Sequence, residues 1–473
     1  MATTATDFGA PLEDGRDGGL TAFPVEEETV LRPEESVLTR RIAQLFFATF
    51  WLIVFTGSVR KWIFPGSGIF YLLQDVPISL AYVYALYKGF FTRGLLFVGM
   101  MLLGAILALQ TLLQIVAIDL SPKVGFIGLH HYIYYAPMLL VFPLGLTARY
   151  RRDFIRWNLW AAVPMLPLSL VQATSAPSAW VNQSTMGDSF SLPGVDVARI
   201  SGPFNYTAAY GLWVALAFAL CLGEWLLAPE RRASKSRSLL LFATGSWALI
   251  ALISGSRENI VVCAAAAAGA CVAAGLIGSA RSVAMILVGV MSIPIAVGAV
   301  YLINPTEYET MQRRFFDKTN SDYEMKGRVG ENLYGWLYEA EFSFIGQGVG
   351  MGIDAAHVGS VDAYNFTYGL SESDTVRNVM ELGTPVGYLW NFTRMLFALG
   401  MIGLAWRLTP LSPHGLPLTC MLFGQVVWDM TRYATTSYTQ VMVGYCFVFG
   451  VLLYPTIIGV DGVEMDVAPG WEG

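Results

Sequence analysis

The stretch ISGSRENIVVCAAAAAGACVAAGLIG, residues 253–278, decides how this chain folds. From Ile260 onward it is apolar or small, and about 20 such residues in a helix span the hydrocarbon core of a bilayer. Its alanine run, residues 264–268, offers small side chains for close helix packing. Arg257 stands just before the apolar run. The stretch therefore predicts a transmembrane helix that begins with a fixed positive charge.

The whole chain has the composition of a membrane protein. Its 473 residues are 55% hydrophobic and 14% charged, and the mean hydropathy is +0.53. Soluble proteins of this size are more polar. The net charge of −6 implies no nucleic-acid partner. All five cysteines lie in apolar runs, which argues against a disulfide framework and a thiolate metal site, and no metal or cofactor is expected.

Apolar runs long enough to cross a membrane predict an all-α, polytopic bundle of about twelve transmembrane helices. The runs lie at residues 40–57, 69–88, 94–116, 126–146, 155–173, 206–228, 238–254, 259–278, 282–303, 384–406, 414–433 and 438–459.

Basic residues in the short connections indicate how the bundle is oriented. They fall in every second connection: Lys88 and Arg93; Arg149, Arg151, Arg152 and Arg156; Arg231, Arg232, Lys235 and Arg237; Arg281; and Arg407. Because cytoplasmic connections carry an excess of lysine and arginine, we expect these connections and both termini on the cytoplasmic side. Arg60 and Lys61 break the alternation, since they fall on the predicted outer face.

This orientation divides the chain into five parts. Residues 1–37 are polar, lack the pattern of a signal peptide and predict a disordered cytoplasmic tail. We expect helices in 38–303 with an external loop at 174–205, a large external loop at 304–383, further helices in 384–460, and a cytoplasmic tail at 461–473. The large loop is predicted to be partly helical, because residues 333–340 form an amphipathic pattern ahead of a glycine-rich turn at 346–352.

Four arginines lie in or next to the two external loops, where charge sorting predicts few of them. Guanidinium groups bind phosphate oxygens in pairs, so these arginines together predict a site for a phosphate or diphosphate. They are Arg199, Arg257, Arg328 and Arg377. Each has a structural alternative: Arg257 snorkels to the interface, Arg199 is a surface residue, Arg328 pairs with Glu331 or Asp322, and Arg377 pairs with Glu381.

The motifs around these arginines occur in a recognisable order. They are Arg199-Ile-Ser-Gly-Pro-Phe204, Ser254-Gly-Ser-Arg257, Gly327-Arg328 ahead of Trp336, Ile345-Gly-Gln-Gly-Val-Gly350, and Glu381-Leu-Gly383. Over residues 195–405 this order resembles the bacterial O-antigen ligase and O-antigen polymerase superfamily. The resemblance implies an architecture similar to the C-type glycosyltransferases. It also implies inverting transfer of a glycan from undecaprenyl diphosphate to an acceptor hydroxyl, without metal, at the outer face of the inner membrane.

One family feature is missing from this sequence. Many members carry a His-Asn pair shortly before the last glycine pattern, whereas this chain has Glu372-Ser-Asp374-Thr-Val-Arg377 there. Since a general base needs only a positioned acceptor of modest basicity, Asp374 or Glu372 is the candidate catalytic residue. The alternatives are a solvated acidic loop, a pairing with Arg377, or His357 as the base.

Further residues are candidates for lining a glycan or lipid-carrier site. His131 and Tyr134 offer rings on which a sugar can stack, and a structural or interfacial role is the alternative for His131. Trp336 lies in the amphipathic segment of the predicted external loop. Arg394 lies deep in an apolar run, where a charge is costly unless it faces the bundle interior. We expect it to pair with Asp429 or Asp75, or to bind the lipid carrier.

The sequence leaves several functions open. The missing His-Asn pair favours a polymerase of exopolysaccharide, capsule or O-antigen, whose partners are a lipid-linked oligosaccharide, an acceptor glycan and the membrane, with a chain-length regulator and a flippase as further candidates. The alternatives are a ligase that uses lipid A core as acceptor, a secondary transporter or flippase of an anionic or lipid-linked substrate, and an assembly protein that binds through its outer loop.

Overall fold

The computed structural model describes most of the predicted helices and part of the external loops. The described residues are 37–64, 70, 73–89, 95–183, 198–204, 206–278, 284, 298, 301–302, 305, 308–309, 312, 330, 334–338, 343–352, 373–428, 435–453, 456–458 and 464–466. The predicted helix at 282–303, most of the loop at 304–383 and nearly all of the two predicted tails lie outside them.

Within the described part of the chain, helices occupy the predicted apolar runs. They are α1 (Val37–Ser58), η1 (Val59–Ile63), α2 (Asp75–Tyr87), α3 (Leu95–Ala117), α4 (Pro122–Leu129), η3 (His130–Tyr134), α5 (Met138–Val141), η4 (Phe142–Gly145), α6 (Ala148–Thr174), η5 (Trp180–Asn182), α7 (Thr207–Leu226), η6 (Pro229–Arg231), α8 (Arg237–Ile253), α9 (Arg257–Ile277), α14 (Trp336–Tyr338), α16 (Asp374–Leu382), α17 (Thr384–Leu408), α18 (Gly415–Trp428) and α19 (Thr435–Leu453). Two short antiparallel strands, β1 (Thr456–Ile458) and β2 (Glu464–Asp466), follow α19.

The described part of the chain is almost entirely helical, and the length and composition of its helices support a membrane protein. Six helical segments are long and apolar enough to cross a bilayer: Val37–Ile63, Leu96–Ala117, Pro122–Gly145, Ala148–Thr174, Thr207–Leu226 and Arg257–Ile277. Much of α3 is exposed, and its exposed side chains include Met101, Leu109 and Leu112. Apolar surface of this extent suits contact with lipid chains, where helices satisfy their own backbone hydrogen bonds.

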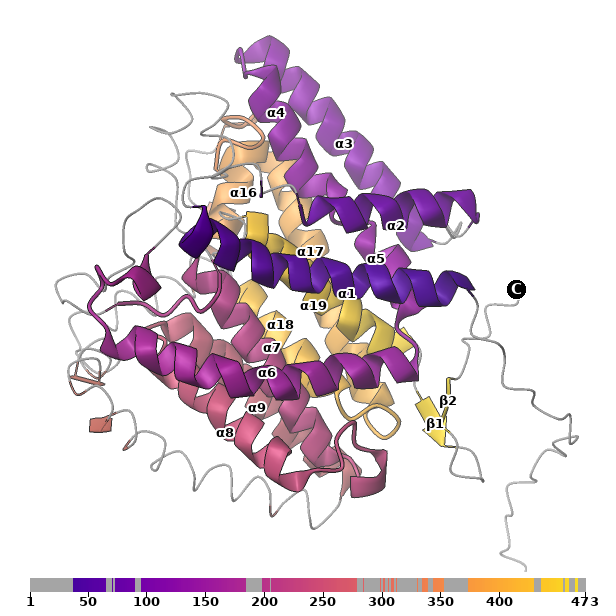
Figure 1. The fold of residues 1–473 in the computed structure, drawn as a ribbon. Helices are drawn as coiled ribbons and strands as arrows, with labels where there is room; N and C mark the ends of the chain where they lie inside the picture. The colour runs from indigo at the N-terminus through magenta and orange to yellow at the C-terminus, as the bar shows by residue number, and fades with distance from the viewer. Residues whose placement is uncertain are drawn as a thin grey trace, which may run out of the picture. The chain divides into compact units, whose positions relative to one another are not determined.

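Helix α7 forms the centre of the described bundle. It packs against α6, α8, α9, α18 and α19, and most of its side chains are buried (Figure 1). On its face toward α6, the indole of Trp213 donates to Asn158 Oδ1 at 2.7 Å. The rings of Phe50 and Phe204 meet Trp213 edge-on. The core therefore combines aromatic packing with a satisfied polar contact.

Small residues bring α9 and α18 into close contact, as the alanine run predicts. A side-chain carbon added at Gly269 would lie 2.6 Å from the Leu416 carbonyl oxygen. One added at Gly424 would lie 2.8 Å from the Ala265 methyl group. Glycine and alanine at these positions let the two backbones approach, and dispersion contacts hold the helices together.

Two five-residue π turns interrupt the α-helical pattern. In η1, which follows α1, the Phe64 N–H donates to the Val59 carbonyl oxygen at 2.8 Å, five residues back. The other, η3, continues α4 and contains His131. Such turns are rare and occur often at functional positions.

The contact between α9 and α18 generates a stability prediction. Gly269→Leu forces a side chain against the α18 backbone, and overpacking of this kind costs about 1–3 kcal/mol. Gly275→Leu is the matched control, since no atom lies within 4 Å of a side-chain carbon at that position. We expect a lower Tm of the purified protein in detergent only for Gly269→Leu. Equal Tm values for the two variants would contradict the packing described.

Candidate functional site

The Arg199–Phe204 motif is held by polar side chains from α6 and η1. Lys61 Nζ donates to Ser201 Oγ at 2.6 Å and to the Gly202 carbonyl oxygen at 3.3 Å. Gln172 donates to the same carbonyl at 3.2 Å and accepts from the Gly202 N–H at 2.9 Å. Gly202 has φ +52°, a conformation that glycine adopts without strain. The loop is therefore fixed by its backbone, while Arg199 remains half-buried.

The start of α7 lies against both this loop and the start of α9. A side-chain carbon at Gly202 would lie 2.6 Å from the Tyr210 ring, and the Tyr210 hydroxyl lies 2.6 Å from Ser169 Oγ. The next residue, Gly211, leaves no room for a side chain against Asn259. The loop of Arg199 and the first turn of α9 thus lie against consecutive residues of α7. We call the Arg199 loop, the start of α7 and the first turn of α9, together with Lys61 and Arg257, the α7 cluster.

Arg257 is the first residue of α9 and is 5% exposed. A tight turn from α8 precedes it, in which Ser254 Oγ donates to the Ala251 carbonyl oxygen at 2.7 Å and Gly255 has φ +65°. The first turn of a helix presents free N–H groups and the positive end of the helix dipole. The position of Arg257 thus combines two features that favour an anion.

The second group of predicted site residues lies on α16. Glu381 is fully buried, and its carboxylate accepts from the Tyr132 hydroxyl at 3.0 Å. It also accepts from the Gly350 N–H at 3.3 Å and the Gly352 N–H at 2.8 Å. Glu381 therefore joins α16 to η3 and to the glycine-rich loop at 343–352. We call these elements the α16 cluster.

Two glutamines of α3, one turn apart, connect the loop to the end of α16. Gln110 donates to the carbonyl oxygens of Ile345 at 2.6 Å and Leu382 at 2.8 Å. Gln114 donates to those of Ile345 and Glu381, each at 2.7 Å, and accepts from the Val349 N–H at 2.8 Å. Buried backbone that is not helical needs such partners, because its N–H and C=O groups have no partners of their own.

Asp374 and Arg377 form a buried ion pair on α16. Asp374 Oδ1 and an Arg377 guanidinium nitrogen lie 3.6 Å apart, and the residues are 0% and 4% exposed. Ser373 caps the helix, accepting from the Val376 N–H at 3.4 Å. This pairing is the structural alternative expected for Asp374. The expected pair of Arg377 with Glu381 stays a prediction.

Trp336 packs against α16 and α17 and is almost completely buried. Its ring meets those of Tyr388 and Phe392 edge-on, with centroids 5.4 and 5.0 Å apart. Val376 and Val379 belong to the same hydrophobic cluster. In this structure Trp336 therefore anchors the external segment to the bundle.

The aromatic residues of η3 lie in a packed environment. The Tyr134 hydroxyl donates to the Asp75 carbonyl oxygen at 2.8 Å and lies 2.6 Å from Ser79 Oγ. His131 is buried, with its ring edge-on to that of Tyr135. These contacts favour packing for His131 and Tyr134.

Asp75, one of the two expected partners of Arg394, contacts other residues. The Asp75 carboxylate lies 3.3 Å from His130 Nε2 and accepts from the Tyr135 hydroxyl at 2.9 Å. Arg394 itself is half-buried on α17. Its other expected partner, Asp429, lies outside the described residues, as do Arg328, Glu372 and His357. Among the residues described, no three His, Cys, Asp or Glu side chains are placed to hold a metal ion.

Sequence reasoning did not identify the residues that hold the two clusters. Lys61 carried a signal, because it broke the charge alternation, and the structure places it, 1% exposed, on the Arg199 motif. The sequence signal was weaker for three glutamines, whose amides lie inside apolar runs: Gln110, Gln114 and Gln172. A comparison with models of known protein families finds no match for the chain, and a comparison with curated proteins finds no relative.

The Lys61 contacts generate a prediction about the Arg199 loop. Lys61→Met keeps the length of the side chain and removes the donor to Ser201 and Gly202, at a cost of about 1–3 kcal/mol. We expect faster hydrogen exchange of the amides of residues 198–204, measured by mass spectrometry. Lys88→Met, at an exposed position after α2, is the control and leaves this exchange unchanged. Unchanged exchange in both variants would mean that Lys61 does not hold the loop.

Proposed function

We propose that this protein is a polysaccharide polymerase of the bacterial inner membrane, with about twelve transmembrane helices and an architecture similar to the C-type glycosyltransferases. It transfers a glycan from undecaprenyl diphosphate to a hydroxyl of an acceptor glycan on the outer face. The product is an exopolysaccharide, capsule or O-antigen chain. The proposal rests on the resemblance of the ordered motifs and on the geometry of the two clusters.

The observation that carries the proposal is the burial of basic side chains at predicted outer helix ends. Lys61, Arg257 and Arg377 are all at most 5% exposed. Charge sorting disfavours basic residues on this side, and burying a cation in a membrane protein is costly. Lys61 bonds the Arg199 loop and Arg377 pairs with Asp374 within the protein. We therefore assign the anionic ligand to Arg257 first, and a lipid-linked diphosphate reaches the same boundary from the bilayer.

In this proposal three arginines bind the diphosphate, each from a different element. Arg257, at the start of α9, binds the diphosphate together with the free N–H groups of the first helical turn. Arg199 lies on the loop that Lys61 fixes. This loop and the start of α9 both lie against α7, and Arg199 binds the same diphosphate from the loop. Arg377 exchanges its ion pair with Asp374 for a phosphate oxygen, which binds guanidinium in the same bidentate geometry as a carboxylate.

When Arg377 leaves Asp374 for a phosphate oxygen, Asp374 becomes available as the general base. Once Arg377 turns to phosphate, the carboxylate accepts the proton of the acceptor hydroxyl. The hydroxyl oxygen forms a bond to the anomeric carbon, the bond from that carbon to the diphosphate oxygen breaks, and undecaprenyl diphosphate leaves with the electron pair. The attack comes from the face opposite the leaving group, so the anomeric configuration inverts.

The positions of the clusters favour an enzyme over a transporter. A transporter gathers its charged residues near the bilayer midplane, where both sides reach them in turn. Here Lys61 and Arg257 lie at helix ends on one predicted side. A ligase that transfers the glycan to lipid A core needs the same leaving group, and the acceptor found in the product distinguishes it from a polymerase.

Loss of the guanidinium at residue 257 tests the diphosphate site. In cells whose own copy is deleted, we expect Arg257→Ala to abolish long polysaccharide on gels, with normal protein in the membrane. Purified Arg257→Ala protein in nanodiscs should bind undecaprenyl diphosphate at least about tenfold more weakly, the loss of about 1.4 kcal/mol or more. Arg199→Ala is expected to act alike. Arg237→Ala, an exposed arginine at the start of α8 on the predicted opposite face, is the control.

Retention of full-length polymer by Arg257→Ala would show that this arginine does not bind the diphosphate.

The base is tested by Asp374→Asn, which keeps the shape of the side chain and removes its capacity to accept a proton. We expect a fall in polymer yield of about a hundredfold or more, because a positioned general base contributes about 10²–10⁴ in rate. Binding of undecaprenyl diphosphate should persist. Asp153→Asn is the control, since Asp153 pairs with Arg156 in the same i,i+3 geometry on the predicted cytoplasmic side. Normal yield from Asp374→Asn would remove this carboxylate from the mechanism.

A further inference from the structure

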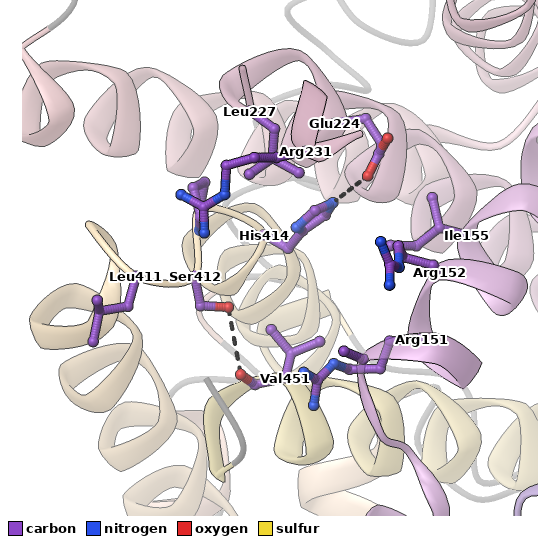
Figure 2. A pocket seen from close by; sticks show the side chains of 12 residues that line it. Arg151, Arg152, Ile155, Glu224, Leu227, Arg231, Leu411, Ser412, His414 and Val451 are labelled. Atoms are coloured by element: carbon purple, nitrogen blue, oxygen red, sulfur yellow. Dashed lines mark hydrogen bonds and ion pairs between the residues drawn. The ribbon is translucent and has the colours of Figure 1, made fainter. Parts of the chain in front are cut away.

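A pocket lies at the other end of the bundle, far along α7 from the α7 cluster. It is lined by the start of α6, the ends of α7 and α19, η6 and the connection between α17 and α18 (Figure 2). Its polar lining comes from Arg151, Arg152, Glu224, Arg231, Ser412 and His414. The charge alternation assigns all of these ends to the cytoplasmic side. We call it the cytoplasmic pocket.

The carboxylate of the pocket is already engaged by the protein. Glu224 is 1% exposed, and one of its oxygens lies 3.1 Å from His414 Nε2. Its other oxygen accepts from the Ala233 N–H at 2.7 Å. Both oxygens of this acid therefore have polar partners within the protein, and the other charged side chains of the lining are arginines.

Three guanidinium groups surround the pocket from different sides (Figure 2). Arg151 is fixed in place, because it donates to the carbonyl oxygens of Leu146 at 3.0 Å and Gly450 at 3.1 Å. Arg152 and Arg231 are half-buried, and they come from separate elements, α6 and η6. Orientation in the membrane requires only that positive charge be present in a connection. Membrane orientation does not explain why three arginines line one pocket whose carboxylate, Glu224, already has partners within the protein.

We propose that the cytoplasmic pocket binds the phosphate of an anionic phospholipid headgroup. Guanidinium groups match phosphate oxygens in geometry and charge, and basic pockets between helices on the cytoplasmic side suit such headgroups. A phosphate between Arg152 and Arg231 links α6 to η6, next to the His414 that precedes α18. The ligand thereby stabilises the end of the bundle opposite the proposed polymerase site, and the proposal does not depend on that function.

The test compares lipid binding by two pairs of variants with equal charge. Purified protein in nanodiscs is titrated with phosphatidylglycerol against phosphatidylcholine, and bound lipid is read by native mass spectrometry. We expect the double variant Arg152→Gln, Arg231→Gln to bind phosphatidylglycerol at least about tenfold more weakly than the wild type. The control, Arg149→Gln, Arg407→Gln, removes two exposed arginines from the same predicted side and outside the pocket, and it binds as the wild type does.

Two further arms separate the sources of phosphate and guard against misfolding. Soluble glycerol phosphate is added to wild-type protein in phosphatidylcholine nanodiscs, and binding of this compound alone would assign the pocket to a soluble phosphate rather than a lipid. Arg231→Gln is measured singly, because it leaves the α6 arginines and the Glu224 contacts in place. If the wild type binds neither probe, or if the pocket and control variants bind phosphatidylglycerol equally well, the proposal is wrong.

Discussion

The close packing of α7 against its neighbours is the constraint on which the rest of the structure depends. At its start, Gly211 leaves no space beside Asn259, and the Tyr210 ring lies against Gly202. At its end, Gly223 leaves no space beside the ring of His414, which contacts Glu224. One nearly buried helix thus positions the Arg199 loop and Arg257 on one side of the bundle and the cytoplasmic pocket on the other. A shift of α7 along its axis would disturb both ends at once.

Polar side chains inside the bundle serve mainly to satisfy backbone that is not helical. The amide of Gln172 bonds the Gly202 backbone in both directions, and Gln114 supports the loop at 343–352 from a helix more than 200 positions earlier in the sequence. Where such backbone is buried, it has no water to bind. Each irregular segment near the proposed site therefore has dedicated donors and acceptors, which makes its shape a fixed property of the fold.

The helical class and the positions of most helices follow from the sequence, because apolar runs of about 20 residues have few other solutions. Close packing of α9 also follows from its alanine run, but the sequence does not identify α18 as the partner. The partners of individual side chains follow only in part. The pairing of Arg377 with Asp374 is one of the expected alternatives, but the hydrogen bonds of Glu381 to loop N–H groups are not among them. Those N–H groups come from a loop whose approach to α16 depends on tertiary packing, which local spacing does not encode.

The π turn η1 has a consequence for the register of the first helix. Its five-residue hydrogen bond adds one residue to a single turn, so every later side chain is rotated by about 100° from its place on a continuous α-helix. A helical wheel drawn at a constant ~3.6 residues per turn therefore fails within η1, where Lys61 is 1% exposed. The same offset means that one inserted residue, rather than a new element, is enough to turn a lipid-facing helix end toward the interior of the protein.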